Sequence, residues 1–401
     1  MLPLDGVRVI DLSQDVAGPF CTRLMADQGA DVIKVEPPNC GDRARRLAPF
    51  PHTLPHPEAG GTFQYLNLGK RGVTLNLACE GGKKALRTLV AGAQVLVESF
   101  EPGVMESQGI GYAPMAEVNP ALVMTSVTHF GQSGPYRHFK ADEITQYGMG
   151  GPMSVTGSPD HPPLNVADGI VFHQAGAAAA LATMIAFFES EVTGVGDHLD
   201  ISIMETQAGN IDRRSLTFLA YQYTGERSGR LPAEVGMASG IFPTSNGYMA
   251  LDAATPAALQ NLPTLIESPE LAHDPRFSDP DARHESENAA MIQSRILEWA
   301  LQQDNQSAWR KAQEHRAMAA PINNAQDLLA DPHYSYRSFW NRIEGPLGTV
   351  RYPGSPLTMG GARVSARRPA PTLGEHNVEI LGGELGFSRE ELAKLKQSGV
   401  I

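Results

Sequence analysis

The stretch GVRVIDLSQDVAGPFCTRLMADQGADVIKVEPP (residues 6–38) decides the fold class. Its first part, residues 6–13, is a short run of β-branched residues after a glycine, which predicts a buried strand. A helix is predicted to start after the Gly-Pro pair at residues 18–19, because proline suits the first turn of a helix. Residues 31–38 predict a second strand, which two prolines bring to an end. The stretch therefore reads as strand, helix, strand.

The same alternation continues along the chain. Further strands are predicted over residues 72–77, 93–100 and 121–131, and a helix over residues 81–93. Strands that alternate with helices at this spacing indicate βαβ units and a parallel sheet. A long apolar helix is predicted over residues 173–191.

Residue usage changes near position 230, which indicates a second domain. An Asn-Gly pair at residues 246–247 predicts the turn of a hairpin, and a charged helical stretch follows it to about residue 330. We therefore predict a large domain over residues 1–225 and a small domain over residues 226–330. Residues 331–401 are too few to fold alone, so we expect them to return to the large domain.

The composition excludes several classes of protein. Apolar residues make up 42% and charged residues 19% of the 401 residues, which is typical of a globular protein. A formal net charge of −12 argues against non-specific nucleic-acid binding, because that binding needs a basic surface. The 12 histidines form no HExxH or similar set, so no metal site is predicted.

The composition also favours a cytoplasmic location. The three cysteines show no CxxC spacing, which is typical of reduced thiols. The N-terminus lacks a basic segment followed by an apolar one, so no signal peptide is predicted. The most apolar segment, residues 175–188, is shorter than the roughly twenty residues of a membrane span. We therefore expect a buried helix there and no membrane partner.

The residues alone do not identify a reaction. The chain has no GxGxxG after the first strand, no GxxxxGK[ST] and no GxSxG, so it shows no dinucleotide fingerprint, no P-loop and no nucleophile elbow. Polar residues do follow or flank the predicted strands, where open α/β sheets place their sites. They lie at residues 15–18, 70–71, 99–103 and 137–143. Composition and spacing indicate an α/β enzyme of unspecified chemistry.

Eight collinear segments, read together, identify a family. They are GVRVIDLSQDVAGPF, ADQGADVIKVEPPNCGD, LNLGKRGVTLNL, VLVESFEPGVMESQGIGY, NPALVMTSVTHFGQSGP, MGGPMSVTGSPD, APINNAQDLLADPH and LGEHNVEILGGELGFS. Nearly the whole chain thus resembles the CaiB/BaiF family, the class III (formyl-CoA transferase-like) CoA-transferases. The resemblance implies a Rossmann-like large domain built from both chain ends, a smaller α+β domain and an interlocked homodimer.

The resemblance also implies a reaction. An aspartate attacks the thioester of an acyl-CoA, displaces the CoA thiolate and forms an acyl-aspartyl anhydride, after which a small carboxylic acid takes over the CoA. A thiol of pKa about 8.5 is a tolerable leaving group. Backbone N–H groups can stabilise the oxyanion. The implied partners are acyl-CoA and a carboxylic acid, with no separate cofactor.

The family's CoA contacts carry over to eight positions. They are Asp15, Val16, Ala17, Lys70, Arg71, Ser99, Phe100 and Lys140. The resemblance implies that the three cations bind phosphates, and the alternative is that they are solvated surface charges. For the aromatic ring the alternatives are contact with adenine or pantetheine and plain core packing. A family arginine falls at Ser107 here, which removes one expected phosphate contact.

The implied nucleophile is Asp168, in the string Val-Ala-Asp before the apolar helix. In relatives an Ala-Gly pair follows within about four residues, whereas here Ala175-Gly176 comes seven residues later. Alignment without gaps from the helix side places the nucleophile position at Phe172 instead. The alternative role of Asp168 is that of an N-cap residue, which Asp favours.

The resemblance also implies a second acid, Glu143, which matches the family's acidic position by counting back from Met149-Gly150-Gly151. We assign Glu143 an orienting role in catalysis and its neighbour Asp142 a surface role.

Two other functions stay open. One is α-methylacyl-CoA racemisation, but that branch has a His-Asp pair where this chain has Ala141-Asp142. The other is a non-catalytic CoA-binding subunit of a heteromeric transferase, which the phenylalanine at the ungapped nucleophile position, Phe172, would suit.

Overall fold

The computed structural model forms two compact units, which we describe separately. It describes residues 2–51, 55–166, 169–210, 215–227, 229–230, 237–345, 348–360, 362–364 and 368–401. The first unit comprises Met1–Ser154, Leu164–Ser228 and Ser335–Ile401, and the second comprises Val155–Pro163 and Gly229–Tyr334.

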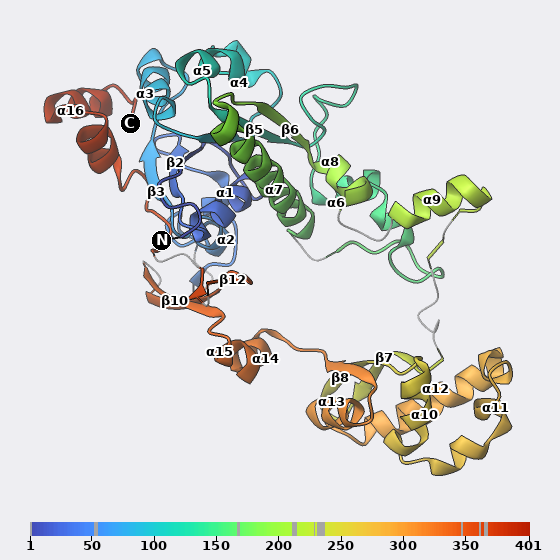
Figure 1. Ribbon diagram of the computed structural model, residues 1–401. Helices are drawn as coiled ribbons and strands as arrows, with labels where there is room; N and C mark the ends of the chain where they lie inside the picture. Colours follow the sequence, from blue (N-terminus) through green and yellow to red (C-terminus); the bar gives the residue numbers. More distant parts are fainter. Residues whose placement is uncertain are drawn as a thin grey trace. The chain divides into compact units, whose positions relative to one another are not determined.

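A six-stranded parallel sheet forms the centre of the first unit (Figure 1). Its strands are β1 (Arg8–Asp11), β2 (Asp31–Glu36), β3 (Arg71–Thr74), β4 (Val95–Glu98), β5 (Val123–Thr128) and β6 (His198–Ser202). They lie in the order β3-β2-β1-β4-β5-β6, and every neighbouring pair is parallel. The predicted parallel α/β sheet is therefore confirmed. The chain returns to the middle of the sheet after β3, so the topological switch point lies between β1 and β4.

Helices cover both faces of this sheet because alternate strand residues point to opposite sides. In β1, Ile10 faces one core and Val9 the other. The first face is covered by α3 (Glu80–Val90), α4 (Val104–Ser107) and α5 (Tyr112–Val118). The second face is covered by α1 (Ala17–Asp27) and α7 (Ile170–Thr193). The near-continuous apolar strands that the sequence shows are what burial on both faces requires.

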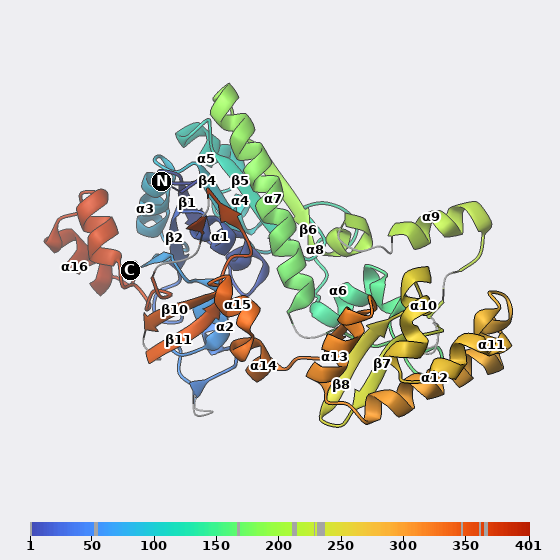
Figure 2. The same cartoon turned by 60° about the horizontal axis from the view of Figure 1, so that its bottom comes forward.

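Helix α7 packs along α1 and lies beside β5 and β6 (Figures 1 and 2). It begins at Ile170, about one turn before the predicted start at residue 173. By length and composition alone, α7 would suit a membrane span. The prediction of a buried helix is wrong for one of its faces, because Leu181, Ile185, Phe188 and Val192 are 62–73% exposed. The sequence could not separate the two faces, because both are apolar.

The C-terminal segment returns to the first unit, where Ile380 and Leu381 are buried in the core of the first face. Asn377 fastens it to β3, since its Oδ1 accepts the N–H of Thr74 at 2.8 Å. The segment comprises the pair β10 (Trp340–Gly345) and β11 (Gly348–Pro353), the pair β12 (Thr358–Met359) and β13 (Ala362–Arg363), η7 (Val378–Glu384) and α16 (Arg389–Gln397).

Short helices complete the first unit. They are η1 (Arg43–Arg46), α2 (Gly61–Leu66), α6 (Glu143–Met149), η3 (Pro152–Val155), α8 (Ile203–Glu205), η4 (Thr206–Asn210) and α9 (Ser215–Thr224). Of these, η1 and α6 position residues of the site described below.

The second unit packs helices on a three-stranded antiparallel sheet of order β7-β8-β9. Its elements are β7 (Ser239–Thr244), β8 (Gly247–Asp252), α10 (Pro256–Leu265), η5 (Pro269–His273), α11 (Pro275–Ser278), η6 (Ala282–His284), α12 (Ser286–Leu301), α13 (Asn305–Glu314), β9 (Met318–Pro321) and α14 (Ala325–Ala330), and α15 (Pro332–Tyr336) follows. The predicted hairpin is present, but Ser245 and Asn246 form its turn, one residue earlier than expected, because Gly247 pairs with Thr244.

The contact between α1 and α7 leads to a prediction about Gly176. A Cβ added there would lie 2.4 Å from the carbonyl oxygen of Ala17, which belongs to the backbone and cannot rotate away. We expect Gly176→Ala to lower the free energy of unfolding by about 1–3 kcal/mol. Urea denaturation measures this change.

The matched control is Gly148→Ala in α6, where the nearest atom to the added Cβ is 3.9 Å away. There alanine should leave stability unchanged or raise it by up to about 1 kcal/mol. Equal effects at the two glycines would contradict the proposed close approach of the helices.

Candidate active site

Three loops meet at the carboxyl edge of the parallel sheet. Asp15 follows β1, Ser99 follows β4 and His129 follows β5. Ser99 connects two of the loops across the switch point, since its Oγ accepts the backbone N–H of Gln14 at 2.9 Å. Open α/β sheets bind their ligands at this place.

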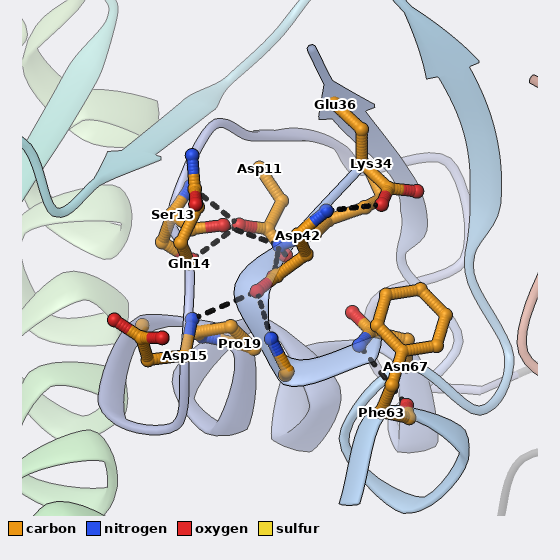
Figure 3. Close-up of polar contacts among 12 residues, drawn as sticks. Asp11, Ser13, Gln14, Asp15, Pro19, Lys34, Glu36, Asp42, Phe63 and Asn67 are labelled. Atoms are coloured by element: carbon orange, nitrogen blue, oxygen red, sulfur yellow. Dashed lines mark hydrogen bonds and ion pairs between the residues drawn. The ribbon is translucent and has the colours of Figure 1, made fainter. Parts of the chain in front are cut away.

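A buried polar network fixes the position of the loop after β1 (Figure 3). The Lys34 ammonium lies 2.7 Å from one carboxylate oxygen of Asp42. The other oxygen of Asp42 accepts the backbone N–H of Asp15 at 3.0 Å. Asp11 lies beside this pair and accepts a hydrogen bond from Lys70 Nζ at 2.8 Å. The position of the Asp15 backbone therefore depends on charges that are shielded from water.

The pKa of each charged group in this network depends on the other charged groups. Burial by itself would raise the pKa of Asp11, but the ammonium groups of Lys34 and Lys70 lower it well below its usual range. Burial lowers the pKa of Lys70 to about 8, although Asp11 partly opposes that shift. For Lys34 the attraction of Asp11 and Asp42 outweighs burial, and the pKa is raised.

The predicted phosphate contact of Lys70 receives no support from its position. Its side chain is completely buried, and Nζ donates to Asp11, to the carbonyl of Pro19 at 2.9 Å and to Asn67 Oδ1 at 2.8 Å. All three protons of an ammonium group have acceptors. Lys70 therefore connects β1, α1 and α2 from inside.

Arg71 lies on another part of the sheet and has acceptors of its own. Its guanidinium bonds Asp31 at 2.9 Å and Glu379 at 2.7 Å, and it also bonds Glu384. This cluster joins the C-terminal segment to β2 and β3. Four of the five N–H groups of Arg71 thus donate to carboxylates, counting a second bond to Asp31, so its predicted phosphate contact has no support from this arrangement.

Among the three positions predicted after β1, Asp15 alone has an exposed side chain. Its backbone is left-handed with φ +65°, and its carboxylate pairs with exposed Arg43. Val16 is the N-cap of α1, and Ala17 is the first helical residue, before the predicted start; both are buried. Val16 and Ala17 therefore offer backbone groups rather than side chains to a ligand.

In the segment after β4, Phe100 is partly buried and Glu101 is exposed. Phe100 packs partly buried against the core of the first face, which favours the packing alternative. Its backbone N–H donates to Glu98 Oε2 at 2.6 Å. Lys140, from the loop before α6, pairs with Glu101, and both side chains are at least 70% exposed. Such an exposed pair is weak, so Lys140 is free to bind a phosphate.

Glu98 is a residue that the sequence reasoning missed. It ends β4 at the switch point and is 2% exposed. Burial raises its pKa to about 7, although hydrogen bonds from Ser126 and the Phe100 backbone partly oppose that shift. An acid that ends an otherwise apolar strand was the signal that could have identified it.

Glu143 holds the start of α7. Its carboxylate accepts the N–H of Gly169 at 2.5 Å and that of Val171 at 2.8 Å. The N-cap position of α7 falls at Gly169, with φ +87°. Asp168 itself lies outside the described residues. Glu143 therefore holds the backbone of the residue that directly follows it.

Two neighbours clarify this end of the site. Asp142 is exposed as predicted, and it also caps α6, since its Oδ1 accepts the N–H of Thr145 at 3.1 Å.

Phe172, the alternative nucleophile position, lies in the first turn of α7 with its ring centroid 6.2 Å from that of His129. His129 was also missed, because it falls inside the strand predicted over residues 121–131, whereas β5 ends at Thr128. A titratable residue near the end of an apolar predicted strand was the available signal. Within the described ranges no group of acidic, histidine or cysteine side chains suits a metal ion.

The buried carboxyl of Glu98 predicts a pH-dependent stability. The folded pKa of about 7 exceeds the ordinary 4.5, so its contribution is complete below pH 4.5 and is lost as pH rises through 7. Relative to Glu98→Gln, the wild type should lose on the order of 2–3 kcal/mol between about pH 5 and pH 8. Urea denaturation at several pH values measures the difference, with Glu117→Gln on the exposed face of α5 as the control.

The cap of α7 predicts the behaviour of two amide protons. Glu143→Ala removes both acceptors and should speed hydrogen exchange at Gly169 and Val171 by about tenfold to hundredfold, since charged hydrogen bonds contribute about 1.5–3 kcal/mol. Glu143→Gln retains one oxygen and should show a smaller increase. NMR or mass spectrometry measures the exchange, and Glu191→Ala at the other end of α7 should change nothing.

Comparison with known proteins identifies the family. Residues 4–377 match the family model described as CoA-transferase family III. The chain is 34% identical over 410 residues to the succinyl-CoA–D-citramalate CoA-transferase of Chloroflexus aurantiacus, covering 100% of this chain and 98% of that protein. It is 31% identical over 405 residues to a subunit of the succinyl-CoA:(R)-benzylsuccinate CoA-transferase of Thauera aromatica, covering 98% and 97%.

The fold agrees with a solved structure. A CaiB/BaiF family protein from Brucella suis superposes with a TM-score of 0.84 at 28% identity, covering 95% of this chain and 99% of that one. The sequence match and the fold match each extend over nearly the whole chain. The protein therefore belongs to CoA-transferase family III and is an enzyme, a class III CoA-transferase.

Proposed function

We propose that this enzyme transfers CoA from an acyl-CoA thioester to a small carboxylic acid, with Asp168 as the nucleophile. The two hydrogen bonds that the Glu143 carboxylate accepts at the start of α7 support this proposal most directly. Glu143 binds the N–H groups of Gly169 and Val171, and Gly169 directly follows Asp168. Two bonds to the adjoining backbone limit the positions that an aspartate there can take, as an oriented nucleophile requires.

The reaction proceeds by exchange of acyl partners. The Asp168 carboxylate attacks the thioester carbon, the C–S bond breaks, and CoA leaves as thiolate while an anhydride forms. The thiolate then attacks the aspartyl carbonyl and releases the donor acid, which leaves CoA on Asp168. The acceptor carboxylate then attacks this enzyme-bound thioester, which releases CoA thiolate and forms an anhydride between the acceptor and Asp168. The thiolate attacks the acceptor's carbonyl carbon in that anhydride, so that acceptor-CoA forms and the Asp168 carboxylate is regenerated. The sum is acyl-CoA plus acceptor acid giving donor acid plus acceptor-CoA, with no net change of charge and no water consumed.

The cations and loops support CoA as the ligand. Lys140 and Arg43 are exposed near the carboxyl edge of the sheet, and within the part of the chain that the structure describes each pairs with an exposed carboxylate. Phosphate can compete for such pairs, because exposed ion pairs contribute little. We propose Lys140 as a phosphate contact and the backbone from Asp15 to Ala17, with Ser99 and Phe100, as the other edge of the CoA site.

The relatives' names agree with this substrate class. The proteins from Chloroflexus aurantiacus and Thauera aromatica are named for succinyl-CoA as donor and for a second acid as acceptor. We propose the same kind of donor and acceptor for this chain, without choosing among individual acids.

We further propose that two chains form an interlocked homodimer. Leu181, Ile185, Phe188 and Val192 recur every three or four residues along α7 and so lie on one face of the helix. Their exposed fractions of 62–73% leave a continuous apolar stripe, of a kind that marks a protein interface.

Trapping with hydroxylamine tests the nucleophile. The protein is incubated with an acyl-CoA such as succinyl-CoA, hydroxylamine is added, and peptides are examined by mass spectrometry. We expect a hydroxamate on Asp168. Asp168→Asn should abolish it and lower the transfer rate about 10³-fold or more, since the variant lacks the covalent step. Asp160→Asn, at an exposed aspartate eight residues earlier in the sequence, is the control.

Other outcomes of that experiment would change the proposal. A hydroxamate on another carboxyl group would contradict the role of Asp168. Binding of CoA without any adduct, for several acyl-CoA donors, would favour the non-catalytic subunit, for which the Thauera aromatica relative is a precedent because it is named as a subunit. Exchange of deuterium at the α carbon would favour the racemase alternative.

A further inference from the structure

His129 lies between the parts of the site and has no part in the mechanism above. It follows β5 directly, and its carbonyl accepts the N–H of Met204 at 3.1 Å, which holds the backbone in place. Its ring centroid lies 6.4 Å from that of Phe130 and 6.2 Å from that of Phe172, in the first turn of α7. The imidazole is therefore placed beside the helix start that Glu143 holds.

One ring nitrogen of His129 lacks a partner. Nδ1 is buried and makes no hydrogen bond among the residues that the structure describes. A buried polar atom without a partner costs about 1–3 kcal/mol, so folded proteins rarely keep one without a use. A ligand group that reaches this nitrogen would remove the cost. The unpaired nitrogen thus indicates a contact that forms when substrate binds.

The surroundings keep the ring uncharged. Burial lowers the pKa of His129 below its usual value, and Arg43 and Lys140 act in the same direction, while Asp15 and Asp142 oppose them. All four charged residues belong to segments of the candidate site. A neutral imidazole carries one N–H donor and one acceptor. At neutral pH the ring can therefore donate a hydrogen bond without bringing a full charge into the site.

We propose that His129 is a further catalytic residue, which donates a hydrogen bond from Nδ1 to the carbonyl oxygen of the acyl group. This inference rests on the proposed transfer reaction. When a carboxylate attacks the thioester carbon, the C=O electron pair moves to that oxygen, and the imidazole N–H stabilises the resulting oxyanion. No proton changes place, and the pair returns as the C–S bond breaks. A donor of this kind contributes about 10²–10³-fold to the rate.

Three variants test this role. His129→Phe keeps a ring against Phe172 but removes the donor, and it should lower the single-turnover rate of hydroxamate formation about 100-fold while the Kd for CoA stays unchanged. His129→Asn places an amide N–H near the position of Nδ1 and should restore the rate to within about tenfold of the wild type. His284→Phe, an exposed histidine of the second unit, is the control.

The outcomes separate this inference from the proposed function. If the wild type forms the Asp168 adduct and His129→Phe forms it within about threefold of the same rate, the role of His129 is refuted. A similar loss in His129→Phe and His129→Asn would show a structural role and would refute it too.

A measurement independent of turnover covers the case in which the wild type forms no adduct. Histidine is labelled with ¹⁵N, and the His129 Nδ1 resonance is assigned by its loss in His129→Asn. A dethia analogue of succinyl-CoA, in which CH₂ replaces sulfur, should shift this resonance, while CoA without an acyl group should not. Equal shifts with both, or none with either, would overturn the proposal.

Discussion

The ion pair between Lys34 and Asp42 is the interaction on which the site depends. Both side chains are at most 1% exposed, and Asp42 also binds the backbone of Asp15. Removing one partner of a buried pair leaves the other charge unpaired, which costs about 3–5 kcal/mol. The pair therefore specifies one position for the loop after β1. Asp11 and Lys70 extend the same network to α1 and α2, so the loop and the sheet are stabilised together.

A second constraint acts at the other side of the site. Glu143 comes from α6, yet its carboxylate occupies the positive end of α7, where a negative charge is favourable. The two helices are thus held to one geometry at the helix start. His129 reaches the same helix turn from β5 through Phe172. Glu143, His129 and Phe172 belong to different segments of the chain, and the packing of α6, α7 and the loop after β5 brings them together there.

Much of the fold could be predicted from local patterns. Strands β1 to β5 and helices α1, α3 and α7 lie within a few residues of their expected bounds, because burial on two faces requires apolar strands at regular spacing. Strand β6 was not predicted. The patterns were less informative for side chains. Lys70 and Arg71 read as surface cations, but one is enclosed among oxygens and the other is shared by three carboxylates. Residue type does not reveal such partners, since they are remote in the sequence.

The sequence alone determined the class of fold and the family, and it indicated the segments of the candidate site, because periodicity and collinear motifs are properties of the chain. The tertiary structure alone decided which polar groups meet. It made Gly169 the cap of α7, gave Glu143 its two backbone partners, buried Glu98 and left Nδ1 of His129 unpaired. The physical reason is that hydrogen bonding and desolvation depend on distances between residues far apart in the chain. Only the packing of the sheet and its helices sets those distances.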